Sequence, residues 1–432
     1  MNREILKLAI PNIVSNITIP LLGIIDLALM GHMESEKYIG AIALGTMIFN
    51  VLYWAFAFLR MGTSGFTAQA FGEKNKQEQA LNLFRSTLTA FIGASLLILF
   101  QIPIEFLSFN LIGGGQEVEQ LAREYFYIRI WAAPATISLF AFNGWYLGMQ
   151  NARIPMIIAL VINVLNILFN LLFVFGFGMK SEGVALGTLL AQYSGFATAL
   201  FYLKKDFNWV FRYWQWKAIT QLSKLKLFFK VNSDIMIRTF CIIGVFSFFT
   251  SKSASIDDTV LAVNSLLLQF LFFFSYFIDG FAFAGEAIIG KYLGAKDRDN
   301  YHKAIQKLFV WGGGLALLFS VCYYLGGELI LGLLTNQEAL IETSNQYLPW
   351  LIAVPIISFA SFIWDGIYIG ATASKAMRNT MLIATFGLFI PGFIIGHNYI
   401  GNHALWLAML LFMFGRGFFQ TIIAPKAIYR LL

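Results

Sequence analysis

Residues 144–148 read GWYLG, and residues 366–370 read GIYIG. The numbers of the two segments differ by a fixed offset (366 − 144 = 222), and the same offset joins Gly72 to Gly294 and Tyr125 to Tyr347. Five identical residues at one offset indicate that the chain consists of two related halves. The sequence therefore predicts one scaffold that is built twice.

The apolar runs around this repeat are long enough to cross a membrane. A helix needs about 20 apolar residues to span the hydrocarbon core, and continuous rather than alternating runs favour helices over a β-barrel. Six spans in each half start both halves on the same side, which makes the repeat parallel. We predict an all-α membrane protein with twelve transmembrane helices, at 6–31, 39–62, 82–106, 124–149, 154–178, 183–203, 226–250, 259–283, 304–326, 347–371, 378–397 and 403–425.

The composition excludes several classes of protein. Hydrophobic residues make up 58% of the chain and charged residues 12%, about half the 25% that is typical of soluble domains. The two cysteines lie in apolar runs and the four histidines are scattered, so we expect neither a disulfide framework nor a metal site. Walker, GxSxG and HExxH motifs are absent from the sequence, so we expect no enzyme, no cofactor and no use of ATP.

The basic residues predict the orientation of the chain. If the N-terminus lies inside, 22 Lys and Arg residues fall in inner segments and only Lys37, Arg123, Lys180 and Lys252 in outer ones. This positive-inside bias places both termini in the cytoplasm. It also explains the net charge of +7 without a nucleic-acid partner.

The longest inner connection marks the boundary between the halves. Residues 204–225 mix basic and aromatic side chains, a composition that suits the headgroup layer of a bilayer. We predict a six-helix lobe at 1–203, an interfacial linker at 204–225 and a second six-helix lobe at 226–432.

Polar residues within the spans are the candidate functional groups. Asp26 lies about 20 residues into its helix, where an acid costs on the order of 3 kcal/mol to insert. Burial raises the pKa of such an acid and nearby donors lower it, so the group can take up and release a proton. Asn163, Asn166 and Asn170 share one helical face and form either an amide shell around Asp26 or a packing interface.

The second half carries more intramembrane charges than the first. Buried charges must pair, so we predict that Arg238 and Arg416 pair with Asp279, with Asp365 or with both. The network is either structural or a second site for protons or substrate. Its predicted members are Asp234, Arg238, Asp279, Glu286, Asp365 and Arg416.

Several segments resemble the multidrug and toxic compound extrusion (MATE) family, in particular its DinF branch. The resemblance covers nearly the whole chain. It is carried by Pro11, Ser15-Asn16-Ile17, Pro20 to Gly23, Asp26, Gly31-His32, Leu59 to Thr63, Ala68 to Gly72, Asn232, Asp234, Arg238, Asp279 to Ala282, Glu286, Asp365-Gly366, Gly370 to Thr372 and Met377-Arg378-Asn379.

This resemblance implies a V-shaped pair of six-helix lobes that works by alternating access. It implies a monomeric antiporter in the inner membrane of a bacterium, which exports lipophilic, often cationic, drugs and toxins in exchange for protons or sodium ions. The coupling residues that it implies are Asp26, Asn166, Asn170 and Thr188, with Tyr125, Asn143 and Asn163 along the substrate path. Relatives carry an Asp at the position of Asn170, and the missing charge favours protons over sodium.

Three other functions compete with drug export. A lipid-linked precursor flippase of the same superfamily would need more basic residues inside the spans to hold a pyrophosphate. A membrane-embedded enzyme would need a catalytic motif. A channel would conduct ions without coupling, which alternating access between repeats disfavours.

Overall fold

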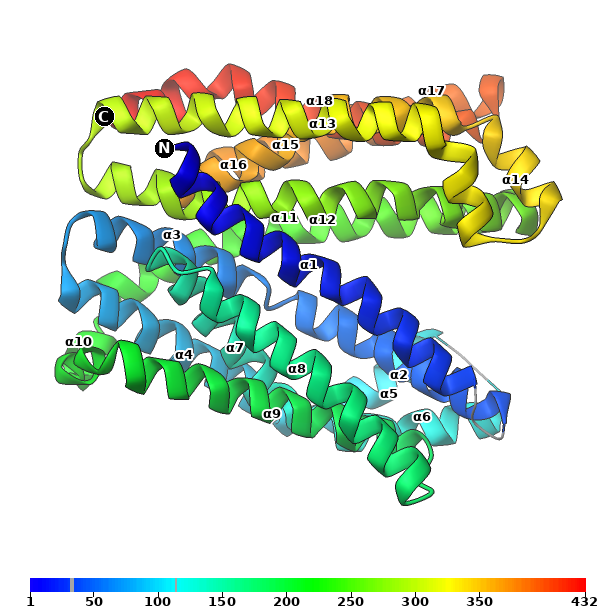
Figure 1. Ribbon diagram of the computed structural model, residues 1–432, viewed down its shortest axis with the longest axis horizontal. Helices are drawn as coiled ribbons and strands as arrows, with labels where there is room; N and C mark the ends of the chain where they lie inside the picture. Colours follow the sequence, from blue (N-terminus) through cyan, green and yellow to red (C-terminus); the bar gives the residue numbers. More distant parts are fainter. Residues whose placement is uncertain (32–34, 113–114) are drawn as a thin grey trace. The chain divides into compact units, whose positions relative to one another are not determined.

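The computed structural model describes residues 1–31, 35–112 and 115–432 (Figure 1). The side chains of residues 22, 24–30 and 112 lie outside this description. The chain divides into two compact units. The N-terminal unit is Val14–Phe228, and the C-terminal unit combines Met1–Ile13 with Phe229–Leu432. Because the division falls inside the first helix, that helix contributes to both units.

The predicted twelve-helix architecture is confirmed. Helix α1 (Asn2–Gly31) covers the first predicted span, and the described residues contain eleven more segments that are long and apolar enough to cross a membrane. In the N-terminal unit these are α2 (Glu36–Trp54) with α3 (Phe58–Gly72), α4 (Lys76–Leu99), α6 (Gln116–Arg129) with η1 (Ile130–Ala132) and α7 (Ala133–Gly148), α8 (Arg153–Leu171) with η2 (Leu172–Gly176), and α9 (Ser181–Asp206).

The C-terminal half repeats this pattern. Its spans are α11 (Leu222–Ile256), α12 (Asp258–Gly294), α13 (Arg298–Leu334), α15 (Leu348–Gly370), α16 (Ser374–Leu382) with η4 (Ile383–Phe389) and α17 (Ile390–Ile400), and α18 (His403–Ala427). The connecting segments add α5 (Gln101–Ile112), η3 (Asn208–Tyr213), α10 (Trp216–Ile219), α14 (Glu338–Asn345) and η5 (Tyr429–Leu431).

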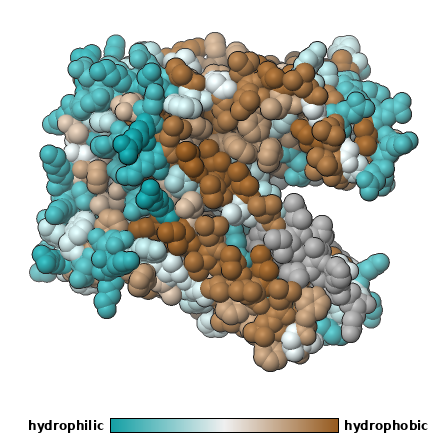
Figure 2. All heavy atoms as spheres, viewed as in Figure 1, coloured by the Kyte–Doolittle hydropathy of each residue, from teal (hydrophilic) through white to brown (hydrophobic). Residues whose placement is uncertain are grey.

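The long helices follow directly from the sequence pattern. Most extend several residues beyond the predicted spans, because their polar ends continue the helix into the headgroup layer. Figure 2 shows hydrophobic side chains along the middle of the helices and hydrophilic ones toward their ends. Both η2 and η4 are π-helical turns, a local widening that is often found at functional sites.

The repeat is visible in the contacts inside each unit. In the N-terminal unit a Cβ on Gly144 would collide with the backbone of Arg60, and in the C-terminal unit a Cβ on Gly366 would collide with the backbone of Ala282. Arg60 and Ala282 are themselves related by the repeat offset (282 − 60 = 222). Only glycine lets two helices approach this closely, so the GWYLG and GIYIG segments build the same close helix crossing twice.

The helix ends repeat as well. Lys74 and Lys296, which the same offset relates, have φ angles of 56° and 55°. The next residues, Asn75 and Asp297, cap the following helices by accepting a hydrogen bond from the backbone N–H three residues later, at 3.0 and 3.1 Å. The two halves therefore share backbone geometry at these turns, even where Asn75 in one half is replaced by Asp297 in the other.

Replacing Gly366 with alanine is expected to destabilise the C-terminal unit. The added Cβ overlaps the Ala282 backbone, which cannot move aside as a flexible side chain can, and overpacking of this kind costs about 1–3 kcal/mol. The thermal unfolding temperature of the purified protein in detergent should fall. Gly314→Ala on α13 is the control, because a Cβ there meets no atom within 4 Å. Equal unfolding temperatures for the two variants would contradict the close crossing.

The start of α1 is fastened to α12 within the C-terminal unit. The carboxylate of Glu4 accepts hydrogen bonds from Lys291 Nζ at 2.5 Å and from the Tyr292 hydroxyl at 2.8 Å. Further along, Ile13 packs against Gly280, where a Cβ would overlap it. These contacts explain why the first thirteen residues belong to the C-terminal unit.

Candidate functional site

Three of the four predicted coupling residues form a chain of hydrogen bonds in the N-terminal unit. Asn170 Nδ2 donates to Asn166 Oδ1 at 3.2 Å, and Asn166 Nδ2 donates to Thr188 Oγ1 at 3.0 Å. The Thr188 hydroxyl in turn donates to the carbonyl of Val184 at 2.8 Å. Both asparagines are 2% exposed, so the cluster is shielded from the surroundings of the helices.

The packing of α8 against α9 creates this cluster. Asn166 and Asn170 are one helical turn apart on α8, and Thr188 lies on α9. Gly187 lies next to Thr188, and a Cβ there would collide with the side-chain oxygen of Asn170. A glycine at this position lets the two helices approach closely enough for the amides to reach Thr188.

The other coupling residue, Asp26, lies on α1, but its side chain is outside the described residues. Its proximity to Asn166 and Asn170 therefore stays a prediction. Among the described residues, no group of three or more His, Cys, Asp or Glu side chains is placed to hold a metal ion.

The residues predicted along the substrate path are distributed differently. Asn163 is only partly buried, so it differs from the fully buried Asn166 and Asn170. Tyr125 on α6 is buried against α2, where its hydroxyl lies 3.5 Å from Thr46 Oγ1. Asn143 on α7 has a buried side-chain oxygen without a hydrogen-bond partner in the described part of the chain. A role in the substrate path stays a prediction for all three.

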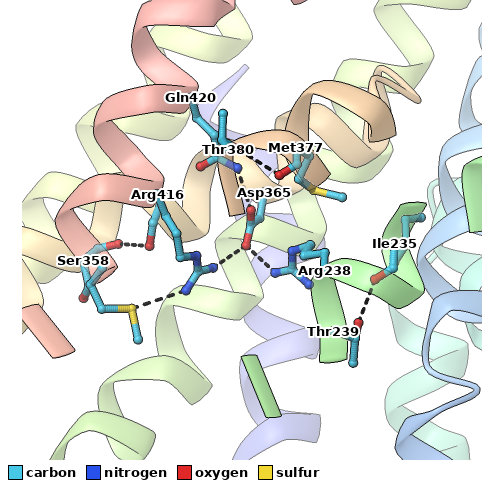
Figure 3. A network of polar contacts seen from close by, with 11 residues as sticks. Ile235, Arg238, Thr239, Ser358, Asp365, Met377, Thr380, Arg416 and Gln420 are labelled. Atoms are coloured by element: carbon cyan, nitrogen blue, oxygen red, sulfur yellow. Dashed lines mark hydrogen bonds and ion pairs between the residues drawn. The ribbon is translucent and has the colours of Figure 1, made fainter. Parts of the chain in front are cut away.

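The C-terminal unit brings two arginines to one carboxylate (Figure 3). One oxygen of Asp365 on α15 accepts from Arg238 on α11 and, at 2.5 Å, from Arg416 on α18. Its other oxygen accepts from Gln420 Nε2 at 2.8 Å. All of these side chains are nine-tenths or more buried. The predicted pairing of both arginines with an acid is observed, and Asp365 is the partner that they share.

Asp234, another predicted member of the network, has different partners from Asp365. Asp234 pairs with Arg378 of α16 at 2.5 Å and accepts from the Ser374 hydroxyl at 2.8 Å. Glu286 is buried on α12, and Asp279 on the same helix contributes an electrostatic interaction with Arg416. The single predicted network is therefore at least two clusters, one around Asp365 and one around Asp234.

Sequence reasoning missed Arg378, Ser374 and Gln420 as members of these clusters. A signal existed for Arg378, because it lies near the start of its predicted span, as Asp234 does, and a buried acid needs a counter-charge. Gln420 lies one turn after Arg416 on α18, so its amide reaches the same carboxylate. Nothing in the sequence marks Ser374, which reaches Asp234 only through the packing of α16 on α11.

Comparisons with known proteins agree with this architecture. The sequence model of the MatE family matches residues 11–195 and 235–395. The chain is 36% identical to DNA damage-inducible protein F of Escherichia coli over 96% of this chain and 90% of that one. It is 24% identical to the probable multidrug resistance protein NorM of Thermotoga maritima, over 88% and 80% of the two chains. The crystal structure of the Vibrio cholerae MATE transporter VcmN in the bent form superposes with a TM-score of 0.87 at 19% identity, covering 99% of this chain and 97% of that one.

Proposed function

Because the chain belongs to the MatE family of membrane transporters, we propose that it is a secondary active antiporter that exports lipophilic small molecules, many of them cationic, in exchange for protons. Relatives include the probable multidrug resistance protein of Thermotoga maritima and the multidrug export protein MepA of Staphylococcus aureus. Their names support export of drugs and toxins rather than an enzymatic reaction.

The observation that carries this proposal is the buried chain from Asn170 through Asn166 to Thr188. Polar side chains inside an apolar bundle need partners, and these three are joined by hydrogen bonds in a chain that contains no basic residue. Such a cluster can stabilise a small cation or an ionised acid by means of amide dipoles. Asp26 of α1 is the acid that would use it.

The proposed coupling step is a change in the protonation of Asp26. In an apolar setting burial favours the neutral acid, whereas amide and hydroxyl donors favour the carboxylate. A proton that binds from the outside neutralises Asp26 and weakens its hold on a cationic substrate. Return to the inside releases the proton, and the carboxylate then accepts the next substrate.

Protons fit the proposed site better than sodium ions. A sodium site is built from several oxygen ligands, and charged carboxylate oxygens are the preferred ones. The cluster of Asn166, Asn170 and Thr188 contributes only neutral groups, and Asp26 would be the sole carboxylate. A single acid is sufficient to carry a proton, so we propose proton coupling and keep sodium as the alternative.

We further propose that the protein works as a monomer in the inner membrane of a bacterium with both termini in the cytoplasm. The positive-inside bias of the basic residues supports this orientation. The proposed lobes are 1–203 and 226–432, and 204–225 forms the interfacial linker that contains η3 and α10. For the buried charges around Asp365 we propose a structural role, because each charged group there already has a partner.

Asn166→Ala is expected to lower drug export without unfolding the protein. The change removes the donor to Thr188 and the acceptor for Asn170, and loss of groups that support a site in this way costs roughly ten- to a hundredfold in activity. The measurement is the rate of ethidium efflux from energised cells, normalised to the amount of protein in the membrane.

Asn110→Ala provides the matched control, because Asn110 is an exposed asparagine on α5 of the same unit. Its efflux rate should equal that of the unchanged protein. If Asn166→Ala exports ethidium as fast as Asn110→Ala, the amide cluster has no part in coupling.

A further inference from the structure

A pocket of about 390 Å³ opens in the C-terminal unit between α11 and the segment α16–η4–α17. This volume lies within the range of small-molecule sites. The pocket is separate from the clusters around Asp365 and Asp234. Its lining residues are Ile237, Phe240, Cys241, Gly244, Val245, Phe248, Leu382, Thr385, Phe386, Phe389 and Ile390.

Four of the eleven lining residues are phenylalanines. Phe248 packs edge-on against Phe389, with ring centroids 5.6 Å apart, and against Phe393 at 5.1 Å. Phe240 and Phe386 are 50% and 61% exposed, so they form a rim that is open to the surroundings. The pocket therefore offers flat apolar walls to an incoming ring system.

Only two lining side chains, Cys241 and Thr385, are polar. The Thr385 residue is 6% exposed, and its hydroxyl oxygen makes no hydrogen bond of ordinary geometry in the described part of the chain. Its polar neighbour is the Cys241 thiol, which is a weak hydrogen-bonding group. A buried hydroxyl that lacks a good partner is unusual. Thr385 also belongs to the π-helical turn η4, the kind of distortion that is common at binding sites.

Two lining residues of this pocket correspond, through the repeat, to candidate functional residues of the first half. Phe248 on α11 is the counterpart of Asp26 on α1 at the repeat offset (248 − 26 = 222), and Thr385 is the counterpart of Asn163 on α8. At these two positions the second half carries an aromatic ring and a hydroxyl where the first half carries an acid and an amide.

The charges around the pocket disfavour a cationic ligand. None of the lining residues is acidic. Lys252 Nζ lies 5.9 Å from the centre of the Phe248 ring. An organic cation beside Phe248 would therefore lie near the positive charge of Lys252, and no lining carboxylate would offset it.

We propose that this pocket binds uncharged lipophilic molecules with an aromatic body, and that it serves as a second substrate subsite of the transporter. The inference rests on the proposed export function, which it extends to a class of substrate. The Phe248, Phe386 and Phe389 rings would stack on the ligand, and the Thr385 hydroxyl would donate to one acceptor on it.

Protection of Cys241 from chemical labelling tests the proposal directly. Cys322 and Cys241 are the only two cysteines, so Cys322→Ser leaves Cys241 as the single thiol. The protein is placed in phosphatidylcholine nanodiscs, and the rate of N-ethylmaleimide labelling is followed by mass spectrometry. Nile red, an uncharged aromatic dye, should slow labelling about tenfold at ten times its Kd. Ethidium, a cation, should leave the rate unchanged.

Three outcomes would overturn the proposal. Failure of Cys241 to react would show that the pocket is closed. Equal protection by ethidium and Nile red would show that the pocket does not select uncharged molecules. No protection by Nile red would show that the pocket does not take this class of ligand, as expected if acyl chains of the bilayer fill it.

Filling the pocket provides a second, independent test. Gly244 lines the pocket, and a Cβ there meets nothing within 4 Å, so Gly244→Phe adds a ring without displacing other atoms near the backbone. Gly314→Phe on α13 is the matched control, because Gly314 is equally unobstructed and lies outside the pocket. Gly244→Phe should slow Nile red efflux about tenfold and leave ethidium efflux as in Gly314→Phe.

The two tests separate the pocket from the export function. Unchanged Nile red efflux in Gly244→Phe, with normal ethidium efflux, would reject the subsite and leave the proposed function intact. If the unchanged protein exports neither dye but Nile red still protects Cys241, the proposed export function is rejected, whereas binding of uncharged ligands in the pocket is supported.

Discussion

Replacing Asp365 with alanine is expected to lower the unfolding temperature of the protein by on the order of 10 °C. The carboxylate of Asp365 is the shared partner of two buried arginines, Arg238 and Arg416. Its removal leaves both positive charges without that partner in an apolar interior, and breaking a buried ion pair in this way costs about 3–5 kcal/mol. The measurement is thermal unfolding of the purified protein in detergent. Asp299→Ala, at an exposed position at the start of α13, should unfold at the original temperature.

A variant in which apolar side chains replace the whole cluster around Asp365 tests whether that cluster is structural or takes part in transport. Buried ion pairs can often be exchanged for apolar side chains of similar volume with little loss of stability. We therefore expect the combination of Arg238→Met, Asp365→Leu and Arg416→Met to recover most of the stability that Asp365→Ala loses. If this variant also exports ethidium normally, the cluster is structural. A stable protein without export would assign the cluster a role in transport.

Asp26→Asn is expected to abolish drug export while the protein still reaches the membrane in normal amounts. Asparagine keeps the size and the hydrogen-bonding capacity of the side chain but cannot gain or lose a proton. Coupling should therefore stop, and cells that produce the variant should be as sensitive to ethidium as cells without the transporter.

Asp206→Asn serves as the control for this change, because Asp206 ends α9 and is exposed. Cells that produce it should keep full resistance. Asp26→Glu retains a titratable group and should keep part of the activity. Full resistance in the Asp26→Asn strain would remove Asp26 from the coupling step.

Much of the fold is predictable because it depends on patterns along the chain. The length of an apolar run indicates a span whatever the neighbouring helices do, and the constant offset between the halves predicts which positions correspond. The structure confirms the correspondence most clearly at Gly144 and Gly366, where the same close helix crossing is formed twice. At these two positions glycine alone predicts the close crossing, because any larger side chain would collide with the neighbouring helix.

The candidate sites were less predictable, because they depend on the rotation of one helix against another. Asp279 and Asp365 lie at similar depth, so counting residues along their spans could not show that both arginines would turn toward Asp365. The helical periodicity of α8 put Asn163 on the same face as Asn166 and Asn170, yet Asn163 is only partly buried. The apolar pocket could not be predicted either, because the sequence does not distinguish apolar side chains that line a pocket from those that fill a core.

The proton-coupling claim is tested most directly by ethidium uptake into inside-out membrane vesicles under imposed ion gradients. A vesicle interior made acidic relative to the medium should drive ethidium accumulation by the unchanged protein and not by Asp26→Asn. A sodium gradient of equal size should drive none. Accumulation by Asp26→Asn at the original rate, or accumulation that follows sodium and ignores pH, would contradict the proposal that Asp26 couples export to protons.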